Sequence, residues 1–432
     1  MRGLKPKNWD FGITGFILLE MAFMVYFRKG ILNNFVNEFG FFFSSLAIGF
    51  IVLRKYYGKP VAYVAKSAPG NSLKWFWPIP LSAIILLGIF VVALIPVFQK
   101  TPATIAYSDV IPTIHVAVER FLSSQTVYAT ITEFGYTLPL TYLPMQWLPY
   151  IAAAALKIDF RWVAIAIFFL SSIVILYRCF RVSPKISWLL LFLLSFTCWM
   201  LVVNDQGILT MTVELMVAGY YMLLIAGLSG KNPWLRGAVI ALCLLSRYSL
   251  LLWLPLWAFV EFFGSNRKDF FRSCLTIALL VIGIYVIPFL SKDWTSFSQG
   301  YHYYTKAAMG AWHDGDGQSV PFVLNLGLGF AREFFVNLSN LPVDQRLFIL
   351  QKTHIIVCLG SCLLLGIWYW KKRSKIPARI FLLGSFKIYL AFFLAFIQVP
   401  YPYLMITAAG VSIAILGELQ RWQIVPEKAS EF

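Results

Sequence analysis

Long apolar segments recur along the whole chain and alternate with shorter polar segments. An α-helix of roughly 20 apolar residues spans a bilayer, so such segments indicate membrane crossings. The predicted crossings are Trp9–Phe27, Val36–Leu53, Trp75–Phe98, Trp162–Leu176, Ile186–Val203, Ile208–Gly227, Cys274–Leu290, Ile355–Trp370, Ile380–Ile397 and Pro402–Leu416. We therefore predict an all-α fold, a polytopic transmembrane helical bundle.

One further apolar segment, Ala238–Phe263, is too short to cross a bilayer twice. It follows Arg236 and precedes Arg267-Lys268, and a single crossing would put these basic flanks on opposite sides. Two short helices meeting at Ser246-Arg247-Tyr248 would keep both flanks on the same side. The sequence thus predicts a re-entrant hairpin, which brings the total to about 10–12 membrane segments.

The segment Pro139–Leu156 is also apolar, but it contains three prolines. Irregular backbone is tolerated at membrane depth only where protein or water covers it. We expect an interfacial or re-entrant helix with Trp147 and Tyr150 at the level of the lipid headgroups. Sequence alone leaves open whether 138–156 crosses the membrane or lies at its surface.

Composition agrees with a membrane protein, because 59% of the 432 residues are hydrophobic and only 13% are charged. The net charge of +17 could suggest a nucleic-acid partner. However, Lys and Arg favour the predicted inner segments over the outer ones by roughly two to one, as the positive-inside rule requires. The charge therefore reports topology: cytoplasmic N- and C-termini, a location in the cytoplasmic (inner) membrane, and no nucleic-acid binding.

Two long extracytoplasmic loops follow from this orientation, at about 99–160 and 291–352. We divide the chain into an N-terminal two-span addition, residues 1–74, and a catalytic transmembrane module, residues 75–432. The six cysteines lie within or beside the predicted spans. They show no extracytoplasmic pairing pattern, so we interpret them as small apolar residues.

The tripeptide Tyr107-Ser108-Asp109 stands just beyond the outer end of a predicted span. A carboxylate that such an apolar chain presents at the lipid–water boundary is a candidate functional group. The structural alternative is an N-cap for the helix expected to start near Pro112.

Charge is costly within an apolar segment and needs a partner, and three residues in such segments are candidates for a role. Arg247, at the tip of the predicted hairpin, could form a salt bridge to a neighbouring span or bind a phosphate. Glu214 and Lys387 could form a buried structural pair, or they could line a polar cavity.

Several short motifs occur in an order that resembles the GT-C superfamily of integral membrane glycosyltransferases, in particular the bacterial branch that uses polyprenyl-phosphate sugars. The resemblance covers roughly Tyr107 to Leu416. Its motifs are Ser108-Asp109, the helix-like Thr113–Leu122, Tyr128, Tyr136-Thr-Leu-Pro139 with Tyr142-Leu-Pro144, Asn204-Asp205-Gln206-Gly207, Arg247, Gly317-Gln318-Ser319 and Pro400-Tyr-Pro402-Tyr403. Two features depart from the family: its basic residue is often Lys, and a frequent last-span His is absent.

The resemblance implies a GT-C-like glycosyltransferase that moves one sugar from a polyprenyl phosphate to a glycan, lipid-linked or protein acceptor at the extracytoplasmic face. A phosphate leaving group needs little protonation, so one general base, Asp109, suffices, and the sugar carbon is inverted. Cations must stabilise the leaving phosphate. The candidates for this role are Arg247, Lys306 and Arg161, and the expected substrate-binding residues are Asp205, Gln206, Tyr128, Tyr142, His302 and Gln318.

No metal and no cofactor besides the donor lipid are expected. The run His313-Asp314-Gly-Asp316-Gly could hold a cation, but a polar turn is the simpler interpretation. The alternative function is a membrane transporter or flippase of lipid-linked or small polar substrates. Transporters commonly show paired internal repeats with broken helices in matching halves. The sequence shows one hairpin without a matching partner.

Overall fold

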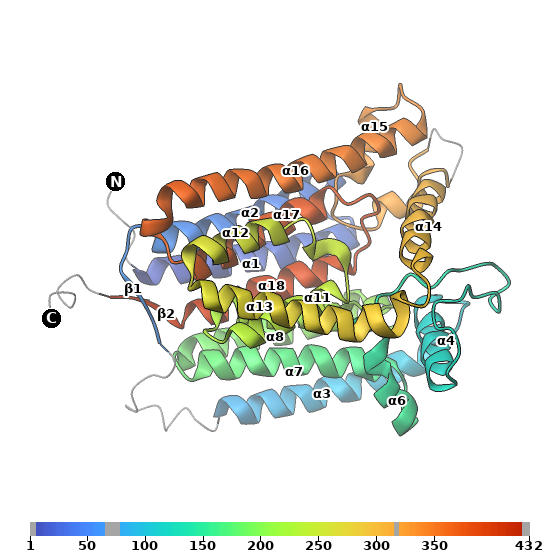
Figure 1. Ribbon diagram of the computed structural model, residues 1–432, viewed down its shortest axis with the longest axis horizontal. Coiled ribbons are helices and arrows are strands. Elements are labelled where there is room, and N and C mark those ends of the chain that lie inside the picture. Colours follow the sequence, from blue (N-terminus) through green and yellow to red (C-terminus); the bar gives the residue numbers. More distant parts are fainter. Residues whose placement is uncertain (1–5, 65–77, 315–318, 426–432) are drawn as a thin grey trace.

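The computed structural model describes residues 6–64, 78–314 and 319–425. Most of them belong to helices whose axes run roughly parallel, as expected for a membrane bundle (Figure 1). The longer helices are α1 (Pro6–Lys29), α2 (Asn34–Tyr56), α3 (Pro78–Lys100), α7 (Arg161–Phe180), α8 (Pro184–Asn204), α10 (Glu214–Ser229), α13 (Arg267–Val281) with its π-helical continuation η4 (Ile282–Leu290), α16 (Val343–Lys372), α17 (Ala378–Ala395) and α18 (Leu404–Leu419).

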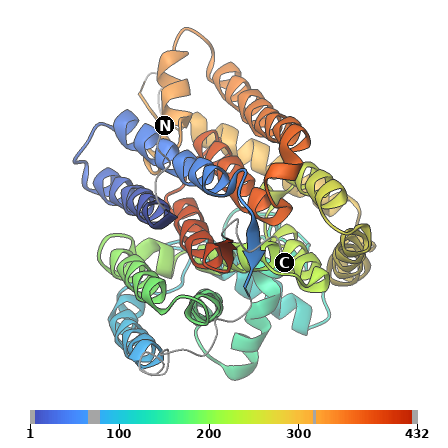
Figure 2. The ribbon, with the colours of Figure 1, turned by 90° about the vertical axis from the view of Figure 1, so that its left-hand side faces the viewer.

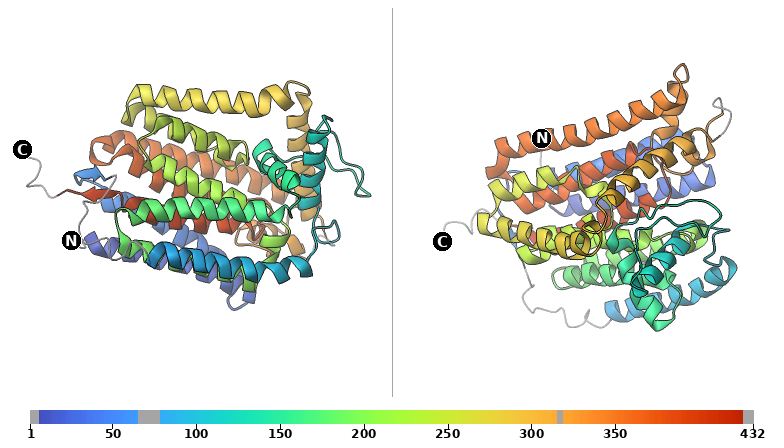
Figure 3. Two further views of the ribbon diagram at one scale, coloured as in Figure 1. Left: turned by 90° about the horizontal axis from the view of Figure 1, so that it is seen from below. Right: turned by 45° about the vertical axis from the view of Figure 1, so that its right-hand side comes forward.

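The two ends of the bundle differ. At one end, which we call the capped end, α4 (Val110–Leu122) and α14 (Thr295–Trp312) run across the bundle direction, and both views of Figure 3 place them together there. At the other end, the sheet end, β1 (Val61–Tyr63) pairs antiparallel with β2 (Trp422–Ile424).

Eight helices in the described part of the chain are long and apolar enough to cross a membrane. Seven of the ten predicted crossings each overlap a single helix of this group over most of their length, and an eighth, Cys274–Leu290, runs from α13 into η4. The first three residues of the predicted crossing Trp75–Phe98 lie outside the described residues. The other two correspond to α10 and α18, which are 16 residues each and almost wholly buried. Figure 2, along the bundle, shows α18 surrounded by other helices. The predicted all-α bundle is therefore confirmed.

The predicted crossing Ile208–Gly227 is interrupted. A short helix, α9 (Gln206–Thr210), ends before Met211, and α10 begins only at Glu214. Glu214 therefore stands at the first turn of a buried helix. Continuous helix through this region was the wrong expectation, because hydropathy gives the extent of an apolar segment and not the path of its backbone.

Ala238–Phe263 does form two short helices. They are α11 (Pro233–Leu244, 12 residues) and α12 (Leu254–Gly264, 11 residues), joined through the 3-10 turn η3 (Tyr248–Leu250). Arg247 lies at this junction with an extended backbone. Asn232 begins α11 by accepting hydrogen bonds from the backbone N–H groups of Trp234 and Leu235.

The segments predicted as long loops contain several helices. Residues 99–160 hold α4, α5 (Pro144–Trp147), η2 (Leu148–Tyr150) and α6 (Ile151–Leu156), and residues 291–352 hold α14, η5 (Phe322–Asn325), α15 (Ala331–Asn337) and the start of α16. Trp147 and Tyr150 are fully buried inside the protein. Aromatic neighbours such as Phe289 cover Trp147. The depth of the two side chains, at the level of the lipid headgroups, stays a prediction.

The first two helices share the core of the rest of the chain. Glu20 of α1 forms a fully buried ion pair with Lys387 of α17, with Nζ and Oε1 2.5 Å apart. Lys387 also donates to Ser45 of α2, and Glu20 accepts from Ser412 of α18. The expected pair of Glu214 with Lys387 is therefore wrong. Residues 1–74, predicted as an addition, contribute two helices to the common hydrophobic core.

Candidate functional site

Asp109 stands directly before α4, at the capped end. Its side chain does not cap that helix; instead Ser108 Oγ accepts a 3.3 Å hydrogen bond from the backbone N–H of Val110. Ser108 Oγ also donates to the carbonyl of Met211, which ties the start of α4 to the break before α10. The Asp109 carboxylate is left partly exposed and accepts a 3.0 Å hydrogen bond from the Tyr136 hydroxyl.

A small hairpin carries Tyr136. Ile131 and Leu138 exchange backbone hydrogen bonds, and Gly135 takes a positive φ of 82° in the turn between them. Arg120, at the end of α4, donates to the carbonyls of Ala129 and Thr130 at the base of this hairpin. Helix α4, which begins after Asp109, therefore also holds the hairpin that places Tyr136 beside Asp109.

Arg247, at the junction of α11 and α12, forms an ion pair with Glu214, at the first turn of α10. The predicted salt bridge to a neighbouring span is therefore present. One guanidinium nitrogen, Nη2, makes this bond, whereas Nε is buried without a partner among the described residues. The second carboxylate oxygen of Glu214, Oε2, is likewise buried without a hydrogen bond. The Arg247 side chain keeps 27% of its surface exposed, against 3% for Glu214.

Tyrosines connect these two charged centres. Tyr142 interacts electrostatically with both Asp109 and Glu214. Tyr303, on α14, interacts with Asp109, and its neighbour Tyr304 interacts with Arg247. Two more tyrosines lie in the segment between α17 and α18. Tyr401 interacts with Asp109, and Tyr403 interacts with both Glu214 and Arg247. We call this set the tyrosine cluster: Tyr136, Tyr142, Tyr303, Tyr304, Tyr401 and Tyr403.

Three tyrosines of this cluster remain protonated because burial and the nearby carboxylate both disfavour a phenolate. Burial, followed by the charge and hydrogen bond of Asp109, raises the pKa of Tyr136 to about 12. Burial, followed by the charge of Asp109, also raises the pKa of Tyr303 and of Tyr401. The cluster therefore offers neutral hydroxyl donors, one carboxylate acceptor at Asp109 and one guanidinium at Arg247.

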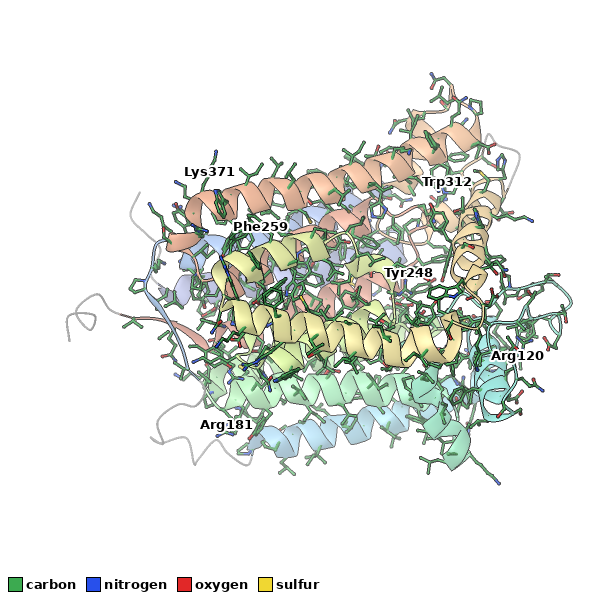
Figure 4. All side chains as sticks on the ribbon, in the orientation of Figure 1. Arg120, Arg181, Tyr248, Phe259, Trp312 and Lys371 are labelled. Atoms are coloured by element: carbon green, nitrogen blue, oxygen red, sulfur yellow. The ribbon has the colours of Figure 1, made fainter. Side chains whose placement is uncertain are left out.

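The segment 139–156 links the capped end to the Arg247 junction. The backbone N–H of Met145 donates a 2.9 Å hydrogen bond to the carbonyl of Leu245, two residues before Arg247. Tyr220 of α10 donates its hydroxyl to the Met145 carbonyl. In Figure 4, Tyr248, the residue after Arg247, lies in the half of the bundle nearer α14.

Tyr128 and Tyr142, both predicted to bind substrate, are placed differently. The Tyr128 hydroxyl donates to the Tyr142 carbonyl and accepts from the indole N–H of Trp147, so it holds segment 139–156 in place. Its ring packs on Phe289 of η4. Tyr142 is half-buried and belongs to the tyrosine cluster.

Arg161 was predicted to bind the donor phosphate, but its donors are already used. It pairs with Asp159, donates to the carbonyls of Thr101 and Phe98, and stacks on the Phe98 ring at 4.1 Å. With 4% of its surface exposed, it fastens the start of α7 to the end of α3. We leave Arg161 out of the site.

The remaining predicted site residues are distributed as follows. Lys306 and His302 lie exposed on α14, the helix that carries Tyr303 and Tyr304. Asp205 is buried between α8 and α9, with 4% of its surface exposed, and Gln206 donates to the Val202 carbonyl. Gln318 lies outside the described residues.

Three apolar grooves lie between helices, away from Asp109 and Arg247. A groove of about 830 Å³ lies between α2, α16 and α17, one of about 600 Å³ between α3, α7 and α8, and one of about 510 Å³ between α12 and α16. Their walls are mainly Leu, Ile, Val and Phe, as expected for surfaces that face lipid tails. Size does not identify the site here, because the charged and hydroxyl groups gather elsewhere.

Within residues 6–64, 78–314 and 319–425, no group of three or more His, Cys, Asp and Glu side chains is placed to hold a metal ion. His313 contacts Asp344 at 2.5 Å, which places this part of the polar run against the start of α16. No protein-family model, no curated protein and no solved structure matches this chain.

Sequence reasoning missed the partners within the site. It placed Glu214 with Lys387, and it assigned no role at Asp109 to Tyr136, Tyr303 or Tyr401. The available signal was the concentration of tyrosines at 301–304, in a predicted outer loop, and at 401–403, around the start of the last predicted crossing. This pattern is also typical of the aromatic belts of membrane proteins, so it did not single out a site.

Proposed function

We propose that this chain is a membrane glycosyltransferase that moves one sugar from a polyprenyl phosphate to a glycan, lipid-linked or protein acceptor. The observation that carries the proposal is the shared tyrosine cluster, which bonds a partly exposed carboxylate, Asp109, through Tyr136 and lies within electrostatic range of a partly exposed guanidinium, Arg247, through Tyr304 and Tyr403. The order of motifs resembling the GT-C superfamily points to the same residues.

The chemistry follows from the charges. The acceptor hydroxyl gives its proton to Asp109 while its oxygen attacks the anomeric carbon of the donor sugar. The bond from that carbon to the phosphate oxygen breaks, and the polyprenyl phosphate leaves with the electron pair. Arg247 compensates the negative charge on the phosphate. Attack opposite the leaving group inverts the configuration of the sugar carbon.

The cluster hydroxyls have a role in this reaction. Tyr136 donates to Asp109 and so orients its carboxylate, while Tyr303 and Tyr401 lie near the same group. Protonated phenols can donate hydrogen bonds to sugar hydroxyls, and their rings can pack against the apolar faces of a sugar. Lys306, exposed on the same helix as Tyr303 and Tyr304, would add positive charge for the leaving phosphate.

Orientation follows from the distribution of basic residues. We place the capped end, with Asp109, at the extracytoplasmic face and the sheet end in the cytoplasm, because Lys371, Lys372 and Arg373 end α16 at the sheet end. A donor lipid in the outer leaflet could then present its phosphate to Arg247 from the side of the bundle. The junction of two short helices is consistent with a re-entrant element at that depth.

Transfer can be tested with purified protein in proteoliposomes. A panel of radiolabelled polyprenyl-phosphate sugars is mixed with lipid and glycan extracts of the cell envelope, and label is followed into a product that no longer carries the donor lipid. We expect transfer from at least one donor, with release of polyprenyl phosphate. Uptake of label across the membrane without cleavage of the donor would instead favour the transporter or flippase.

A further inference from the structure

The ion pair at the α11–α12 junction differs from the other buried pairs of the chain. Arg178 and Glu418, at the sheet end, form two hydrogen bonds to one another, from Nε and Nη2, and Arg178 also donates to the Ala226 carbonyl. Glu418 is fully buried. Such a bidentate, fully used pair is typical of a structural contact.

Arg247 and Glu214 are joined through a single pair of atoms, and each keeps an unused buried atom, Nε and Oε2. The pair Arg236–Glu261 shows the same pattern, because it also forms one hydrogen bond and leaves Arg236 Nε and Glu261 Oε1 without a hydrogen-bond partner in the described part of the chain. The two pairs differ in exposure: both side chains of Arg236–Glu261 are fully buried, and Arg379 approaches the second oxygen of Glu261 to 4.0 Å. The Arg247 side chain remains 27% exposed.

We infer that Glu214 is the resident counter-ion of the donor-phosphate subsite: it holds Arg247 while the site is empty, and it yields part of the guanidinium to the phosphate when the donor binds. This inference rests on the proposed function and adds a positioning role for Glu214. Glu214 does not touch the reacting atoms; it acts through Arg247.

Removing the charge of an ordinary binding residue weakens binding, whereas removing the charge of Glu214 should strengthen it. An empty subsite with an unpaired, mostly buried guanidinium would be costly, so Glu214 supports the fold. Once a phosphate arrives, the Glu214 carboxylate and the phosphate are like charges near the same cation, and each weakens the attraction of the other. Neutralising Glu214 should therefore destabilise the empty protein and strengthen phosphate binding.

The experiment compares Glu214→Gln, Arg247→Met and the matched control Glu418→Gln with the wild type in lipid nanodiscs. The probe is undecaprenyl phosphate, with undecaprenol, which lacks the phosphate, as the reference ligand. Affinity and melting temperature are measured on the same samples. For Glu214→Gln we expect a lower melting temperature and about two- to fivefold tighter phosphate binding, the range of a partly exposed ion-pair contribution.

The outcomes separate this inference from the proposed function. If Arg247→Met binds undecaprenyl phosphate as well as the wild type does, Arg247 is not the phosphate ligand and both ideas fail. If Arg247→Met loses binding while Glu214→Gln binds equally or more weakly, the role of Glu214 fails and the proposed function stands. Glu418→Gln should lower the melting temperature without tightening binding, and tightening there would overturn the assignment to Glu214.

A second variant covers the case in which Glu214→Gln does not fold. Glu214→Asp keeps the charge but shortens the side chain by one methylene, so it should loosen the grip on Arg247 and tighten phosphate binding by a smaller factor than Gln. Unchanged or weaker binding by the Asp variant would contradict the inference.

Discussion

At the scale of single residues, Asp109 is distinguished by what its carboxylate does not do. It stands where an N-cap would be, yet Ser108 bonds the helix N–H and leaves the carboxylate to Tyr136. A general base must be reachable by substrate, and the partial exposure of Asp109 meets this requirement. Asp205, a second predicted carboxylate, is buried between α8 and α9 and does not.

Replacing Asp109 with Asn tests this assignment. The amide keeps the size of the side chain and can still accept from Tyr136, but it is not a base. We expect unchanged melting temperature and donor affinity, with transfer reduced by about 100-fold or more, within the usual range for loss of a general base. Glu133→Gln is the matched control, because Glu133 is an exposed carboxylate on the same loop whose nearest charged group is Arg120. Turnover near the wild-type rate in Asp109→Asn would remove Asp109 from the mechanism.

At the scale of helices, four elements meet at one buried polar centre. Lys387 of α17 bonds Glu20 of α1 and Ser45 of α2, and Ser412 of α18 bonds the same glutamate. All four side chains are buried. Close packing accompanies these bonds, because Gly49 and Gly384 let α2 and α17 approach so closely that a side chain at either position would clash. The centre therefore specifies how the first two helices dock.

Removing one partner of this ion pair should be more harmful than removing both. Lys387→Met leaves the Glu20 charge buried without its cation, which costs about 3–5 kcal/mol in comparable buried pairs. The double variant Lys387→Met with Glu20→Leu removes both charges and should regain most of the lost stability. Melting temperatures in one detergent measure both. A double variant less stable than Lys387→Met would show that Glu20 is held by Ser45 and Ser412 independently of Lys387.

The helices themselves were largely predictable from the sequence, whereas their partners were not. Apolar length located the crossings, and the basic residues on both sides of Ala238–Phe263 indicated two short helices. Hydropathy indicates which residues lie within the membrane, but it does not show which neighbouring helix a side chain faces. Glu20 was therefore missed as the partner of Lys387, and Glu214 was assigned to the wrong cation. The break before Glu214 was missed because hydropathy gives the extent of an apolar segment and not the path of its backbone.

At the scale of the whole molecule, charge distinguishes the two ends of the bundle. The capped end holds Asp109 and the tyrosine cluster, and the sheet end holds β1 and β2 beside the basic end of α16. In the candidate site, Asp109 and Arg247 were predictable because a charge near lipid is costly and marks function. The tyrosine cluster was not, because its members come from segments far apart in sequence, which only the fold brings together.

Orientation in the membrane can be measured by cysteine labelling in intact cells. Lys306 and Asp314 are exposed at the capped end, and Lys371 is exposed at the other end of α16. Single cysteines at the first two positions should react with a membrane-impermeant thiol reagent, and a cysteine at Lys371 should react only after permeabilisation. Cys274, the native cysteine that is not fully buried, is replaced by Ser in the background. Labelling of Lys371 alone would place Asp109 in the cytoplasm.

The central claim, that Asp109 and Arg247 belong to one donor site, is tested most directly by an experimental structure of the protein with bound undecaprenyl phosphate. We expect the phosphate to contact the Arg247 guanidinium within hydrogen-bonding distance, inside the tyrosine cluster and on the side that faces Asp109. The prenyl chain should leave the protein between helices into the lipid. A phosphate bound at the sheet end, or at the capped end without contact to Arg247, would contradict the account.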